Sequence, residues 1–109
     1  MREVFIAMRF TPGRILVSRR VGSAMKRSPP FKEFCKSSLK RHVSCDWGDL
    51  SGRDARLNDF AIGAHERLFS EYKIPISHRR SASFPDECRI WIVTDEDRSA
   101  TVVMFPGDE

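Results

Sequence analysis

The sequence has no apolar run long enough to cross a membrane. Its longest nearly apolar run covers only residues 4–8, whereas a membrane-spanning helix needs about 20 consecutive apolar residues. The sequence also lacks the pattern of charged start, apolar middle and small-residue cleavage site that marks a secretion signal. We therefore predict a cytoplasmic protein without a membrane among its partners.

Cysteine is scarce, and its number is odd. The chain has only Cys35, Cys45 and Cys88, whereas a disulfide framework uses an even number in an oxidising compartment. We predict free thiols, two of them in the core. The spacing Cys35-x6-His42-x2-Cys45 offers three of the four ligands of a structural zinc site. Because Cys35 falls on an apolar stripe, packing in the core is favoured, and no metal or cofactor is expected.

Common catalytic motifs are also missing. The sequence contains no Gly-rich phosphate loop, no nucleophile elbow and no two-histidine metal motif. This excludes most common enzyme classes and favours a protein without catalytic activity.

The length and composition predict one globular domain over residues 1–109. The chain is 40% hydrophobic and 31% charged, which is ordinary for a folded domain. The charge is unevenly divided, since residues 1–44 carry 11 Lys and Arg against 2 acids, while residues 45–109 carry 8 against 13. The basic half permits a nucleic acid or an acidic protein as a partner.

Two β-hairpins are predicted, one near each end of the chain. Residues 3–10 and 14–18 are rich in β-forming residues, and Thr11-Pro12-Gly13 supplies a turn between them. Residues 89–94 and 99–105 form a second pair around a polar tip. Apolar residues occupy successive positions in this second pair, so both of its faces need cover. That favours a central place in a sheet or a homodimer interface.

Two helices are predicted between the hairpins. A short helix of about three turns begins at Phe31, where apolar residues recur at helical spacing. A longer helix is predicted over residues 53–72, and Ser51 with Asp54 approximates a capping box at its start.

Residues 19–30 and 75–88 are predicted to be mobile loops. The first segment contains Gly22 and the Pro29-Pro30 pair, and the second has no periodic pattern. The expected fold is therefore α+β, in the order β-β-α-α-β-β. The two hairpins are expected to form an antiparallel sheet, with one long and one short helix packed on it.

A polar cluster precedes the longer helix. His42, Asp46 and Asp49 surround Trp47-Gly48, and residues of these types serve metal-dependent hydrolases and nucleases. In a structural interpretation, Asp49 or Ser51 caps the longer helix, Trp47 anchors the turn in the core and Gly48 supplies a special backbone angle. We favour the structural interpretation and retain His42, Asp46 and Asp49 as weaker catalytic candidates.

The tip of the second hairpin is another candidate surface. Asp95, Glu96 and Asp97 bring together three carboxylates, which are typical ligands of hard cations. Arg98 competes with such an ion, so an ordinary solvated turn is favoured. The candidate contacts for a partner protein are Trp47, Asp49, Asp95, Glu96, Asp97 and Arg98.

The basic half suggests a surface for phosphate groups. Lysines four residues apart lie along the short helix, and further basic residues lie in the segment before it. A solvated helix face explains the lysines equally well. The candidate nucleic-acid contacts are Arg19, Arg20, Lys26, Arg27, Lys32, Lys36, Lys40 and Arg41.

Two motifs carry a resemblance to a known family. The first is Asp46-Trp47-Gly48-Asp49 followed by Asn58-Asp59, and the second is Ile90-Trp91-Ile92-Val93-Thr94 followed by Asp97-Arg98-Ser99. Together they resemble a family of small, uncharacterised bacterial proteins that are often found on plasmids and other mobile elements. The match spans most of the chain, although Cys45 stands where the family pattern has glycine.

The small size, the lack of a cofactor motif, the apolar hairpin and this resemblance together favour an interaction protein of a mobile element. Such a protein is expected to bind a host or defence-system protein, for example to inhibit a CRISPR or restriction system, with Trp47 or Trp91 as an anchor. One alternative is a nucleic-acid-binding protein that uses the basic N-terminal half. Another is a small metal-dependent hydrolase or nuclease.

Overall fold

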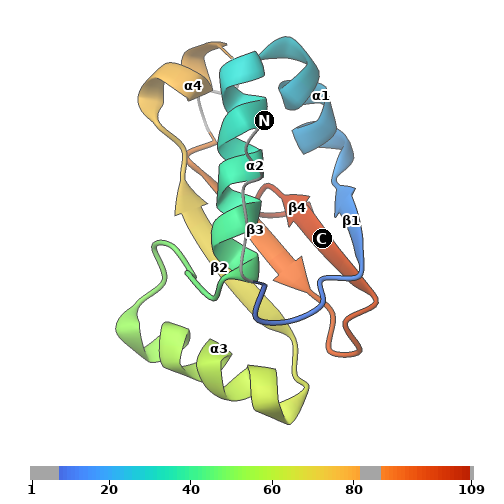
Figure 1. Cartoon of the computed structure of the whole chain (residues 1–109). Helices are drawn as coiled ribbons and strands as arrows, with labels where there is room; N and C mark the ends of the chain where they lie inside the picture. The colour runs from blue at the N-terminus through green and yellow to red at the C-terminus, as the bar shows by residue number, and fades with distance from the viewer. Residues whose placement is uncertain (1–7, 82–86, 109) are drawn as a thin grey trace, which may run out of the picture.

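The fold is α+β, with helices packed on a four-stranded mixed sheet (Figure 1). The computed structural model describes residues 8–81 and 87–108. The strands follow the order β1-β4-β3-β2 across the sheet. Along the chain the elements are β1 Arg14–Val17, α1 Arg19–Arg27, α2 Pro29–Val43, α3 Gly52–Ala64, β2 Leu68–Lys73, α4 Ile76–Ser81, β3 Arg89–Thr94 and β4 Ala100–Met104.

The C-terminal hairpin is confirmed, but the predicted antiparallel sheet is wrong. β3 and β4 pair in antiparallel fashion and occupy the centre, and β2 joins β3 in the same way. β1 instead runs parallel to β4, with Leu16 beside Val102. Both strands of the hairpin are interior, so neither offers a free edge to a second copy of the chain.

The predicted N-terminal hairpin is not formed by the described residues. Residues 3–7 of its first strand lie outside them, and residues 8–10 form no strand. The backbone N–H of Arg9 donates to the carbonyl of Val43 at 2.8 Å. The chain before β1 therefore lies against the end of α2.

The predicted loop over residues 19–30 is wrong, because two serines start helices there. Ser18 accepts a hydrogen bond from the N–H of Val21 at the start of α1. Ser28 accepts one from the N–H of Phe31 at the start of α2. Pro29 and Pro30 occupy the first turn of α2, where a missing N–H costs no helical hydrogen bond.

The predicted helix over residues 53–72 ends early. Its start is confirmed, since Ser51 accepts a hydrogen bond from the N–H of Asp54. It ends at Ala64, and residues 68–73 form β2, in which Leu68 and Tyr72 are buried. A spacing of four positions satisfies both a helix stripe and a strand face, so the pattern did not distinguish them. The predicted loop over residues 75–88 contains α4, and residues 82–86 lie outside the described ranges.

The main core lies between one face of the sheet and helices α1 and α2. Figure 1 shows α2 crossing in front of the central strands. A smaller cluster joins α3 to the sheet through Trp47, Ala61 and Leu68. The main cluster contains Val21, Ala24, Phe31, Cys35, Tyr72, Ile74, Ile90, Ile92, Val103 and Phe105.

The other face of the sheet carries a second set of side chains. Neighbouring residues along a strand point to opposite faces, so Trp91 and Val93 lie opposite the core residues Ile90 and Ile92. Trp91 contacts Phe69 edge to face, with ring centroids 5.1 Å apart. No helix among the described residues is both long and apolar enough to span a membrane.

Candidate functional site

His42 lies at the centre of a buried hydrogen-bond network of polar side chains. It sits on α2, is fully buried, and both ring nitrogens contact hydroxyl groups. Nδ1 lies 2.6 Å from Oγ of Ser70, and Nε2 lies 2.9 Å from Oγ1 of Thr94. The network continues through Thr101, whose Oγ1 lies 2.7 Å from that of Thr94 and donates to the carbonyl of Pro12. Three strands, β2, β3 and β4, and the segment before β1 are thereby joined to α2.

The hydrogen bond from Thr101 to Pro12 fixes the direction of the other hydrogen bonds in this network. A hydroxyl group has one proton to donate, and Thr101 gives its proton to Pro12. Thr101 must therefore accept from Thr94, and Thr94 must accept from Nε2 of His42. The neutral ring then carries its proton on Nε2 and accepts from Ser70 at Nδ1. Burial lowers the pKa of His42 to about 3, so the ring is neutral at physiological pH.

Asp46 is held by Arg41 at the end of α2. Nε and Nη2 of Arg41 donate to the two carboxylate oxygens at 2.7 and 3.1 Å. The same guanidinium lies 5.0 Å from the ring centre of Tyr72, whose hydroxyl donates to the backbone carbonyl of Asp46. The hydrogen bonds from Arg41 lower the pKa of Asp46. The pair fixes the turn that leads from α2 to the sheet edge.

Trp47, Gly48 and Asp49 run alongside the outer edge of β2. The carbonyl of Glu71 accepts from the N–H of Asp49 at 2.7 Å, and its N–H donates to the carbonyl of Trp47 at 3.3 Å. Gly48 has a φ of 73°. A Cβ at this position would lie only 2.6 Å from Cδ1 of Tyr72. Only glycine permits this close approach and this backbone angle.

Side chains complete the cover of the β2 edge. Oδ2 of Asp49 accepts from the N–H of Lys73 at 2.8 Å. Asn58, on α3, accepts from the N–H of Phe69 and donates to its carbonyl. Trp47 is anchored through Nε1, which donates to Asp59 at 2.9 Å. The segment 46–49 and Asn58-Asp59 therefore close one edge of the sheet.

The three catalytic candidates form hydrogen bonds with three separate sets of partners. His42 bonds hydroxyl groups inside the core, Asp46 bonds Arg41, and Asp49 bonds the backbone of β2. Within residues 8–81 and 87–108, no three His, Cys, Asp or Glu side chains form a cluster that could hold a metal ion. This arrangement supports the structural interpretation of the motif.

Arg98 connects the hairpin tip to the end of α3. Its guanidinium donates to the carbonyls of Glu66 at 2.6 Å and Ala61 at 3.2 Å. It also lies 5.9 Å from the ring centre of Phe10. The neighbouring Asp97 accepts from the N–H of Ser99 and so shapes the turn. Asp95 and Glu96 are exposed and, with Arg67, line an open hollow.

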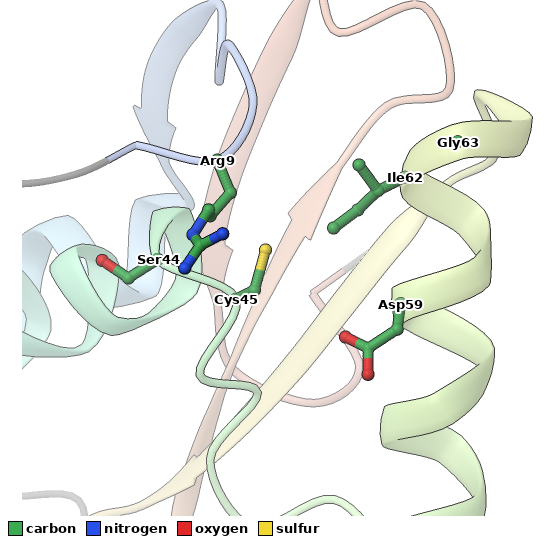
Figure 2. A pocket seen from close by; sticks show the side chains of 6 residues that line it. All are labelled: Arg9, Ser44, Cys45, Asp59, Ile62 and Gly63. Atoms are coloured by element: carbon green, nitrogen blue, oxygen red, sulfur yellow. The ribbon is translucent and has the colours of Figure 1, made fainter.

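A pocket of about 500 Å³ lies between the end of α2 and α3. Figure 2 shows the sulfur of Cys45 pointing into it, facing Ile62 and Asp59 on α3. Burial and the nearby Asp59 raise the pKa of Cys45, so its thiol is not activated as a nucleophile. Cys45 has a φ of 65°, the left-handed region in which glycine is easiest to place.

The other two cysteines differ in exposure. Cys35 is buried, and burial raises its pKa to about 12. Cys88 is exposed. All three are free thiols, and Cys35 is confirmed as a core residue.

The candidate nucleic-acid contacts divide into paired and unpaired cations. Arg20 forms ion pairs with Glu87 and Asp108. Arg41 pairs with Asp46, and Lys36 lies 3.7 Å from Glu33. In the part of the chain that the structure describes, no ion pair involves the exposed Arg19, Lys26, Arg27, Lys32 and Lys40.

The β1 edge of the sheet is exposed, unlike the β2 edge. All four residues of β1 are exposed, with 46% of Ile15, 39% of Leu16 and 43% of Val17 accessible. The N–H groups of Arg14 and Ser18 point toward β4. Because backbone groups of a parallel strand alternate in direction, those of Ile15 and Val17 point away from the sheet. Among the described residues, no strand lies beyond them.

Sequence reasoning missed this edge. Residues 14–18 were recognised as a strand, but a pairing with residues 3–10 was expected to cover it. Ser18, a good helix cap directly after β1, is the missed signal for α1.

No family model, curated protein or solved structure matches the chain in the comparisons.

Proposed function

We propose that this protein is a binding module that recognises a partner protein by strand addition at β1. One observation carries the proposal: within residues 8–81 and 87–108, no strand pairs with the outer edge of β1, which lies beside three exposed apolar side chains. Strand addition uses such groups for affinity and the neighbouring side chains for specificity.

The contrast between the two edges supports this proposal. Folded proteins protect edge strands because an open edge pairs readily with other chains. Here β2 is covered at Phe69, Glu71 and Lys73. An edge that the described residues leave open next to Ile15 and Val17, while they cover the β2 edge at three positions, is typical of a docking surface.

The partner we propose is a host or defence-system protein. This part rests on the resemblance to small proteins that are often found on mobile elements. The bonding of His42, Asp46 and Asp49 within the fold is consistent with action by binding rather than by catalysis.

The proposal is tested with Val17→Pro. Proline removes the outward N–H at this position and leaves the β1–β4 hydrogen bonds of Arg14 and Ser18 in place. We expect a partner protein to copurify from host lysate with tagged wild-type protein in a fixed ratio. The same partner should not copurify with the Val17→Pro variant. Leu57→Ser, an exposed change on α3, serves as the control.

Thermal unfolding shows whether each variant is folded. If Val17→Pro unfolds early, Ile15→Glu replaces it, because a charge on the edge opposes strand addition without a change of backbone. A partner retained equally by folded wild-type protein and by the edge variants contradicts the proposal.

A further inference from the structure

We infer that the segment added at β1 is extended and acidic, with apolar residues alternating with carboxylates. This inference rests on the proposed function and specifies the chemistry of its partner. Three features of the β1 surface carry it: the direction of the backbone groups, a small apolar hollow and a group of unpaired cations.

The hollow lies on the helix side of β1. It has a volume of about 260 Å³ and is lined by Val17 on β1, by Gly22, Met25 and Lys26 on α1, and by Lys32 on α2. Pockets for small-molecule ligands have about 300–1,000 Å³. The hollow is below that range and suits a single apolar side chain.

The position of the hollow matches the geometry of an added strand. Val17 lies beside the core residue Val103 in the β1–β4 register, so its side chain points toward the helices. An added strand pairs next to Ile15 and Val17. Every second side chain of that strand then points to the same face and reaches toward Met25.

Cations without acidic partners surround this edge. Arg14, Arg19, Lys26 and Lys32 are exposed, and no ion pair within residues 8–81 and 87–108 includes any of them. The carboxylates of Glu87 and Asp108 are already bonded to Arg20 on α1. Carboxylates of a partner would therefore contact a positively charged surface.

The same charges oppose a second copy of the chain as the occupant. Antiparallel pairing of two β1 strands would bring Arg14, Arg19 and Lys26 of one copy close to those of the other. Like charges opposite one another destabilise paired strands. An acidic segment gains from the same geometry.

The experiment uses two labelled peptides and fluorescence anisotropy with the full chain. One peptide alternates valine with glutamate, and the other alternates valine with lysine. We expect the acidic peptide to bind about tenfold or more tightly than the basic one, with affinity that falls as salt rises. Val17→Pro should abolish this binding.

Two double variants with the same change of charge locate the surface. Lys26→Glu with Lys32→Glu should reverse the preference between the peptides. Lys36→Glu with Lys40→Glu, both on α2 and outside the hollow, should leave it in place. An equal loss in both double variants would show a diffuse charge effect and overturn the inference.

The other occupants give distinct results. A dimer in sedimentation that Val17→Pro dissociates would assign the edge to a second copy. Slow hydrogen exchange at the amides of Ile15 and Val17 in the free monomer would show that the chain covers its own edge. Single-stranded DNA binding that needs Lys26 and Lys32 but survives Val17→Pro would assign the cations to nucleic acid. Each result overturns the inference.

Different experimental results would contradict the proposed function and this inference. If neither peptide binds wild-type protein, the acidic chemistry is wrong. Loss of a lysate partner in Val17→Pro would still support strand addition in that case.

Discussion

The side-chain amide of Asn58 bonds both backbone groups of Phe69 on the outer edge of β2. Its Oδ1 accepts from the N–H of Phe69 at 3.2 Å, and its Nδ2 donates to the carbonyl. An amide side chain has the same donor and acceptor as a peptide group. Asn58 therefore replaces one residue of a missing neighbouring strand, and α3 holds it in position.

Replacement of this amide should destabilise the fold. Asn58→Leu leaves the N–H and the carbonyl of Phe69 without their partner at a site where Asn58 is buried. We expect the free energy of unfolding to fall by about 1–3 kcal/mol, measured by urea denaturation. Leu57→Ala, on the exposed side of the same helix, should change it by less than about 1 kcal/mol. Equal effects of the two substitutions would contradict this role of Asn58.

Two glycines should respond to alanine in opposite directions. Gly48→Ala places a Cβ 2.6 Å from Cδ1 of Tyr72 on a backbone with a φ of 73°, and we expect a loss of about 2 kcal/mol or more. Gly63 lies within α3, and a Cβ there meets no atom within 4 Å. Gly63→Ala should raise stability by about 0.5–1 kcal/mol. Thermal unfolding of both variants tests the pair, and a stable Gly48→Ala protein would contradict the close approach.

Stability should fall in mild acid because of His42. The folded pKa of His42 is about 3, below its ordinary value of 6.5, so the unfolded chain binds a proton that the folded chain does not. The contribution of His42 is complete above pH 6.5 and falls by about 2–3 kcal/mol by pH 4.5.

A variant without a titrating ring isolates this effect. Asp46 and Asp108 have lowered pKa values and lose their contributions only below their ordinary value of 3.8. The difference in unfolding free energy between pH 7 and pH 4.5 should therefore be smaller in His42→Gln than in the wild type. Nitrogen NMR should also find the proton of the neutral ring on Nε2. A proton on Nδ1 would contradict the deduced direction of the hydrogen bonds.

The side chain of Arg98 should stabilise the fold, whereas its left-handed backbone conformation should destabilise it. Arg98→Ala removes the bonds to Ala61 and Glu66 at the end of α3, and we expect a loss of about 1–2 kcal/mol. Arg98 has a φ of 59°, so Arg98→Gly should recover part of that loss by relieving the backbone. Chemical denaturation compares the two variants, and a glycine variant less stable than the alanine variant would count against this division.

The parts of the fold that sequence reasoning recovered are those with local signals. The C-terminal hairpin has apolar strands around a polar tip, and Ser51 marks the start of α3. Pro29 and Pro30 were interpreted as helix breakers, although proline is compatible with the first turn of a helix. Ser28, directly before them, was the signal that decided between the two interpretations.

The candidate site could not be assembled from spacing alone. Asp46, Trp47, Gly48 and Asp49 were recognised as a motif, but their common task depends on β2 lying beside them. The helix predicted over residues 53–72 includes nearly all of β2, so that strand is absent from the prediction. The partners of His42 on β2 and β3 are likewise distant in the chain and follow only from the pairing of those strands.

The link between Thr101 and Pro12 joins positions 89 residues apart. During synthesis on the ribosome, β1 emerges long before β4, its only neighbour in the described sheet. Within the described residues, β1 therefore has no strand partner until β4 has left the exit tunnel. A chain interrupted after β3 would lack that partner, so the outer edge of β1 takes its final shape at the end of translation.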